Sequence, residues 1–137
     1  MARKKETKRI IHSCQKDIFI VASEFAVVRR DVHRLEYRVD ESMLRRVEQE
    51  MKKLEKRVKP AECCFLIPGG NTLSALLDVC RCVARRAERK AVSIYRRRKA
   101  PNRIALIYLN RLSDLLYLLA RETEKRRTPF VAIDKKR

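Results

Sequence analysis

Three arginines and one glutamate stand at spacings that would gather them on one side of a helix. At about 100° per residue they share a strip beside the apolar positions, formed by Arg81, Arg85, Glu88 and Arg89. Guanidinium groups bind phosphate oxygens through paired hydrogen bonds, and Glu88 could orient an arginine or bind a ribose hydroxyl. The strip predicts a phosphate site, although the residues alone leave open an ion-pair ladder to another helix.

A later helix carries a matching polar strip at steps of four, three and four residues, formed by Asn110, Asp114, Tyr117 and Arg121. If the two helices pack together, both strips face the same space. Asp114 would then neutralise an arginine across the helix interface, and Asn110 would offer hydrogen bonds to a base or a ribose. We expect the function to lie between these two strips.

Residues 65–70 form an apolar run that ends in the turn Pro68-Gly69-Gly70. Glycine permits a positive φ and a close approach of the backbone, and Asn71 or Thr72 can cap the helix that follows. The free amides at that helix start could bind an anion. A Pro-Gly-Gly sequence is a weak signal, so the residues alone favour a tight turn into a helix.

Apolar residues at steps of three and four predict the helices that position these strips. The first covers about residues 6–30, and residues 30–38 either continue it or form a connector. The second is capped by Asp40, carries apolar residues from 43 to 58 and ends before Pro60. The third runs over 72–98, and the fourth restarts after Ala100-Pro101-Asn102, with Pro101 near its first turn, and reaches about residue 126.

These elements predict an all-α, up-down four-helix bundle with a basic groove along the third and fourth helices. We expect one domain over residues 1–137, with a core at about 6–126 and a tail at 127–137 that is loosely held or folded on a partner. The expected buried residues of the third helix are Leu73, Leu76, Cys80, Val83, Ala84, Ala87, Ala91 and Ile94. Those of the fourth are Leu109, Leu112, Leu116, Leu119 and Ala120.

Composition narrows the class of protein. The chain has 137 residues and a net charge of +18, which favours phosphate-rich partners: nucleotides, nucleic acid or an acidic membrane surface. Charges interrupt every apolar segment, so we expect no membrane span, and no signal-peptide pattern is present, which favours a cytoplasmic location. The five cysteines form no CxxC pair and have no histidine at ligand spacing, so we expect reduced thiols and no metal site.

Three segments in order resemble the PduO-type ATP:cob(I)alamin adenosyltransferases: residues 65–70 (FLIPGG), 81–89 (RCVARRAER) and 108–116 (YLNRLSDLL), followed by Leu119-Ala120-Arg121. The resemblance covers about residues 14–125. It implies a helical-bundle homotrimer with active sites between subunits. It also implies a corrinoid (cobalamin) and ATP as ligands, with Mg²⁺ on the phosphates. The implied reaction is attack of Co(I) on the 5′-carbon of ATP, with release of triphosphate.

The resemblance also implies a role for each matching residue. Phe65 would lie over the corrin ring and help to hold cobalamin without its lower axial ligand. Arg81 would form an ion pair at the subunit boundary, and Arg85 would contact the ATP phosphates. Glu88, Arg89 and Asn110 would line the nucleotide site. Asp114 would support an arginine.

Members of that family begin with a Thr/Gly/Asp-rich loop around ATP and a first helix whose aspartate pairs with the Arg81 position. This sequence resembles the family from the second of five helices onward, so we expect a shortened bundle. Three interpretations stay open: a relative that binds corrinoid or nucleotide without efficient transfer, a missing segment supplied by another chain, or an incomplete start. The alternative from another class is a basic helical module for nucleic acid, favoured by the arginine clusters at 96–99 and 125–127.

Overall fold

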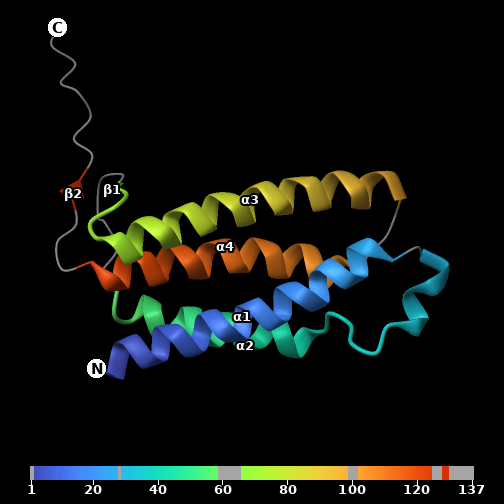
Figure 1. Cartoon of the computed structure of the whole chain (residues 1–137), viewed down its shortest axis with the longest axis horizontal. Coiled ribbons are helices and arrows are strands. Elements are labelled where there is room, and N and C mark those ends of the chain that lie inside the picture. Colours follow the sequence, from blue (N-terminus) through green and yellow to red (C-terminus); the bar gives the residue numbers. More distant parts are fainter. Residues whose placement is uncertain (1, 28, 59–65, 99–101, 125–127, 130–137) are drawn as a thin grey trace, which may run out of the picture.

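A computed structural model describes residues 2–27, 29–58, 66–98, 102–124 and 128–129. Within this part of the chain the elements are α1 (Ala2–Ala26), a short 3₁₀ helix η1 (Arg29–Arg34), α2 (Glu41–Glu55), β1 (Leu66–Ile67), α3 (Thr72–Arg98), α4 (Arg103–Thr123) and β2 (Thr128–Pro129). The four α-helices alternate in direction along one long axis (Figure 1). The predicted up-down helical bundle is therefore confirmed.

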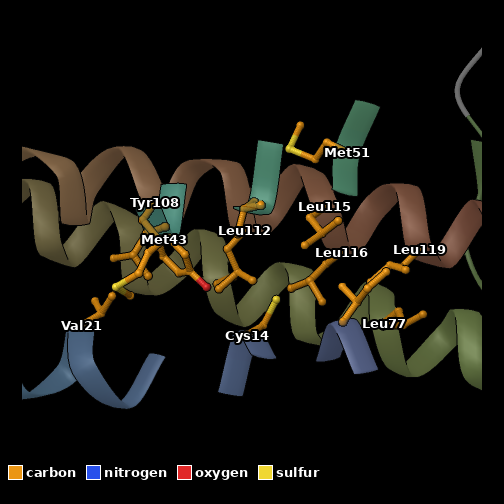
Figure 2. Close-up of a cluster of buried hydrophobic side chains, with 14 of the residues drawn as sticks. Cys14, Val21, Met43, Met51, Leu77, Tyr108, Leu112, Leu115, Leu116 and Leu119 are labelled. Atoms are coloured by element: carbon orange, nitrogen blue, oxygen red, sulfur yellow. The ribbon is translucent and has the colours of Figure 1, made fainter. Parts of the chain in front are cut away.

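Helix α4 is the centre of the bundle, with α3 on one side and the α1–α2 pair on the other (Figure 1). All five residues predicted to face inward are buried, and Tyr108 and Leu115 add a second buried side. Figure 2 shows the labelled α4 side chains, from Tyr108 to Leu119, in one cluster with Cys14 and Val21 of α1 and Leu77 of α3. A helix that is apolar on most sides must be enclosed by its neighbours, which explains the central place of α4.

The predicted buried face of α3 is largely wrong. Leu76 and Val83 are 58% and 49% exposed, whereas the neighbouring Leu77 is 3% exposed and packs in the core. The other exposed residues of the predicted face are Leu73, Cys80, Ala87 and Ile94, while Ala84 and Ala91 are buried as expected. Since α3 is apolar along two sides, its periodicity alone could not decide which side would pack on α4.

The helix ends agree with the sequence to within a few residues. Asp40 caps α2 as predicted, because its carboxylate accepts from Met43 N at 3.0 Å. Helix α1 covers 2–26 instead of 6–30, and η1 follows as the connector. Helix α4 starts at Arg103, directly after its cap residue Asn102, as predicted, and it ends at Thr123 instead of about 126. Pro60 and Pro101 lie outside the described residues.

Residues 128–129 give part of the predicted loose tail a defined partner. Thr128 pairs with Ile67 and Pro129 with Leu66, in a two-stranded antiparallel ladder beside the start of α3 (Figure 1). Residues 130–137 lie outside the described part. The chain after α4 therefore returns to the segment before α3.

A buried polar cluster joins α1, α2 and α4. Asp17 accepts from Tyr108 Oη at 3.0 Å and from Arg46 Nη2 at 2.8 Å. Burial is the main cause that raises the pKa of Tyr108 above its ordinary value. The pKa of Cys14 rises to about 11, chiefly through burial and then through the nearby charge of Asp17. The cluster stays satisfied only with these helices in one register.

None of the described helices is long and apolar enough to cross a lipid bilayer.

Candidate functional site

Arg85, Glu88 and Asn110 form one hydrogen-bonded cluster between α3 and α4. The Glu88 carboxylate accepts from Arg85 Nη1 at 2.5 Å through one oxygen, and from Asn110 Nδ2 at 2.9 Å through the other. The two polar strips predicted from the sequence therefore do face each other here. The Arg85 side chain remains 43% exposed, so its guanidinium can reach a ligand without leaving a buried pocket.

Arg81 lies against an aromatic ring instead of a carboxylate. Its guanidinium carbon is 5.5 Å from the centroid of the Tyr117 ring, a cation–π distance. Within the described part of the chain, no Asp or Glu oxygen lies within 4.0 Å of its guanidinium nitrogens. Arg81 thus keeps an exposed, unneutralised charge on the surface of α3.

Asp114 does not bridge the two helices. Its carboxylate pairs with Arg111 Nη1 at 3.3 Å, one turn earlier on α4, and Arg111 also approaches Glu48 of α2 at 3.7 Å. The predicted neutralisation of an α3 arginine by Asp114 is wrong for this structure. A polar residue at the edge of α4 can turn toward α2 as easily as toward α3, and the spacing did not distinguish the two sides.

Arg89 is exposed and lines a groove beside the glycine turn. The groove has a volume of about 560 Å³, and its lining is mostly apolar, with Arg86 and Arg89 among its residues. Pro68 and Gly69 also line it, together with Val79 and Val83 of α3. Phe65, the predicted corrin contact, lies outside the described residues.

The glycine turn has the predicted backbone, but one of its amides is already used. Gly69 has φ +95°, a conformation that favours glycine, and Asn71 caps α3 by accepting from Ser74 N at 2.9 Å. Gly70 N donates to Glu124 Oε1 at 3.2 Å. The expected free amide for an anion is therefore occupied at Gly70 by a carboxylate from the end of α4.

Two acidic residues of this region were missed by sequence reasoning. Asp78 accepts from the buried Arg121 at 2.5 Å, and Glu124 lies 3.2 Å from the same guanidinium. Asp78 could have been identified from the sequence, because it precedes Arg81 and Arg85 by three and seven residues and so shares their strip. The local sequence pattern could not have identified Glu124, because its partner Gly70 is 54 residues away.

In the described part of the chain, no group of three or more His, Cys, Asp or Glu side chains is placed to hold a metal ion. Cys14, Cys80 and Cys82 are free thiols there.

Comparison with known proteins shows which family the chain resembles. Residues 1–123 match the family model of cobalamin adenosyltransferase. The corrinoid adenosyltransferase of Citrobacter freundii is 34% identical over 122 residues, and that of Mycobacterium leprae is 35% identical over 119 residues. These matches cover 89% and 82% of this chain and 68% and 61% of the relatives, so the chain spans about two thirds of their length.

Solved structures show the same fold. A variant of the PduO-type ATP:corrinoid adenosyltransferase of Lactobacillus reuteri, complexed with cobalamin and ATP, superposes with a TM-score of 0.83 at 24% identity, over 95% of this chain and 73% of that one. A second variant of that enzyme, complexed with ATP, gives 0.80 at 24% identity over 96% and 74%. With the match over residues 1–123, this chain belongs to the cobalamin adenosyltransferase family.

Proposed function

We propose that this chain transfers the 5′-deoxyadenosyl group of ATP to the Co(I) centre of a corrinoid and releases triphosphate. The observation that carries the proposal is the family match over residues 1–123, which includes both helices of the polar cluster. Relatives that are named corrinoid adenosyltransferases support it. In the reaction a Co–C bond forms, the bond between C5′ and the triphosphate oxygen breaks, and the electron pair of that bond leaves with triphosphate.

Negative charge gathers on the triphosphate as it leaves, so cationic donors near it lower the barrier. Arg85 takes this role in the proposal, since its guanidinium is partly exposed and held in place by Glu88. Arg89 adds a second charge one turn along α3. Glu88 and Asn110 would orient the adenosine, and Asp114 would act through Arg111. We expect Mg²⁺ to accompany the ATP phosphates.

The groove beside the Pro68-Gly69 turn is the proposed place for the corrinoid. Its apolar lining suits the face of a flat macrocycle, and Arg86, which also lines it, suits the phosphate of a nucleotide tail. Phe65 immediately precedes β1 in sequence, and the family resemblance supports its role as the residue over the corrin ring. That contact would favour cobalamin without its lower axial ligand.

We propose a homotrimer with its active sites between subunits. The exposed apolar side of α3, including Leu76, Val79 and Val83, supports an interface there, because a monomer rarely exposes such a stripe. Arg81 supports it as well, since this exposed charge could pair with an acidic residue of another subunit. The free thiols suit a reducing, cytoplasmic location.

The test is to reduce cobalamin to Co(I) without oxygen, add the protein and ATP, and follow the Co(I) absorption. We expect its loss to depend on both protein and ATP. Binding of cob(II)alamin or ATP without loss of Co(I) would mark a non-catalytic relative. Binding of neither ligand, together with a steep salt dependence of binding to duplex DNA, would favour the nucleic-acid module instead.

A further inference from the structure

Arg121 and Glu124, here named the anchor pair, lie almost fully buried at the end of α4. Their side chains are 2% and 1% exposed. Arg121 Nη2 lies 2.5 Å from Asp78 Oδ2 of α3 and 3.2 Å from Glu124 Oε1. The same Glu124 oxygen accepts the backbone N–H of Gly70 at 3.2 Å. One buried guanidinium therefore links the end of α4 both to α3 and to the turn that precedes it.

The buried network of Arg121, Glu124 and Asp78 is an inefficient source of folding stability. Two buried carboxylates share one guanidinium, and buried ions lose solvation that their mutual attraction repays only with good geometry. Within the described residues, Arg121 Nε and Glu124 Oε2 have no hydrogen-bond partner. Apolar side chains of similar size would hold two helices together at lower cost, so the network is better explained by the position that it imposes on its partners.

The partner with the least freedom is the glycine turn. A Cβ added at Gly70 would lie 3.0 Å from Glu124 Cγ, Cδ and Oε1, so the backbone sits directly against this side chain. Asn71 Nδ2 donates to Thr123 O at 2.9 Å, and β1 pairs with β2 on the other side of the turn. Three contacts from the end of α4 and the segment after it thus fix residues 66–71.

The position of this turn shapes the groove. Pro68 and Gly69 line it together with Asp78, whose carboxylate is held by Arg121. Arg121 also lies 5.3 Å from the centroid of the Tyr117 ring, against which Arg81 rests. A shift of the anchor pair would therefore move the groove wall and the support of Arg81 together.

We propose that Arg121 and Glu124 are positioning residues that set the groove beside the Pro68-Gly69 turn for its corrinoid. This inference rests on the proposed function. It assigns the link between α4 and the turn to Glu124, whose carboxylate accepts the Gly70 N–H. Loss of the Glu124 carboxylate releases Gly70 and leaves Arg121 with Asp78 and the Tyr117 ring. The ATP cluster at Glu88 and Asn110 keeps its own hydrogen bonds, so the defect is specific to the corrinoid.

The experiment compares Glu124→Ala with Glu122→Ala in the full chain. Glu122 is a matched control, because it is an acid at the same helix end, its side chain is 7% exposed, and it pairs with Arg57, just after α2, at 3.1 Å. We expect Glu124→Ala to raise the KM for corrinoid and the Kd for cob(II)alamin by about tenfold, with the KM for ATP within about twofold of the wild type. Equal corrinoid constants in the two variants would overturn the proposal.

A second pair of variants tests the contact itself. Gly70→Ala places a methyl group against Glu124, and we expect it to weaken cob(II)alamin binding in the wild-type background but much less when Glu124 is also alanine. Additive effects would contradict a direct contact. If Glu124→Ala does not fold, the same measurements are made on Glu124→Asp. This variant keeps the charge but withdraws the carboxylate from Gly70.

The two proposals fail differently. A wild-type chain that neither binds cob(II)alamin nor consumes Co(I) overturns the proposed function and this inference with it. A normal wild type with an unaffected Glu124→Ala variant overturns only the anchor pair.

Discussion

At the scale of single residues, Arg85 is distinguished from the many solvated arginines by its neighbours. Glu88 holds its guanidinium and is itself held by Asn110 from the facing helix. A surface ion pair of this exposure adds little to stability, because its charges are screened by water. A ligand phosphate at the same guanidinium would gain far more, because the charged donor is already oriented.

Arg85→Ala should therefore impair ATP use much more than folding. We expect kcat/KM for ATP to fall by at least about a hundredfold, with a change in the free energy of unfolding below about 1 kcal/mol. Steady-state kinetics and urea unfolding measure the two quantities, with Lys90→Ala as the exposed control on the same helix. Comparable losses in both quantities would show that Arg85 belongs to a structural ion-pair ladder.

Cys14 makes stability depend on alkaline pH. Because the pKa of its thiol is raised to about 11 in the folded chain from an ordinary 9.0, folding favours the neutral thiol. The stability from this preference is complete below pH 9, and it is lost as the pH rises toward 11. We expect the free energy of unfolding of the wild type relative to Cys14→Ala to fall over that window by on the order of 2 kcal/mol. Parallel curves for the two proteins would contradict the raised pKa.

At the scale of elements, α3 presents two apolar sides and α4 only a broad buried one. For α4 the stripe through Leu109, Leu112 and Leu116 predicted the core face correctly, since its neighbours surround it. For α3 the stripe through Leu76 and Val83 predicted the wrong side. Local periodicity reports that a side is apolar, and tertiary packing decides which apolar side meets the core.

The neighbouring leucines of α3 give a matched test of this correction. Leu77→Ala removes a buried side chain and should cost about 2–4 kcal/mol of unfolding free energy, whereas Leu76→Ala should cost less than about 1 kcal/mol in dilute, monomeric protein. Chemical unfolding of both variants measures these values. A larger loss of unfolding free energy for Leu76→Ala than for Leu77→Ala would show that the face predicted from periodicity is the buried one.

The candidate site was predictable only where both partners lay on regular strips. Glu88 and Asn110 each occupy a helical strip that the spacing identifies, and the structure joins them at 2.9 Å. Asp114 lay on such a strip too, but its rotamer turned to Arg111. The contact of Glu124 with Gly70 joins a helix end to a turn across 54 residues, which no local period encodes.

At the scale of the whole molecule, Leu76 of α3 is exposed outside the corrinoid groove, and Arg81 has no carboxylate partner among the described residues. A trimer would bury the first and could neutralise the second. We expect a sedimentation mass of three 16.2 kDa chains at the concentrations of the activity assay, and a smaller species for the double variant Leu76→Glu/Val83→Glu. If the wild type is monomeric and still transfers the adenosyl group at full rate, the proposed trimer with active sites between subunits is wrong.

The most direct test of adenosyl transfer is a product balance in a single anaerobic reaction with cob(I)alamin in excess over ATP. The account predicts that ATP disappears as adenosylcobalamin and inorganic triphosphate form in equal amounts, and that Arg85→Ala forms both far more slowly. Failure of the folded wild type to form adenosylcobalamin, with cob(I)alamin still reduced at the end of the reaction, would contradict it.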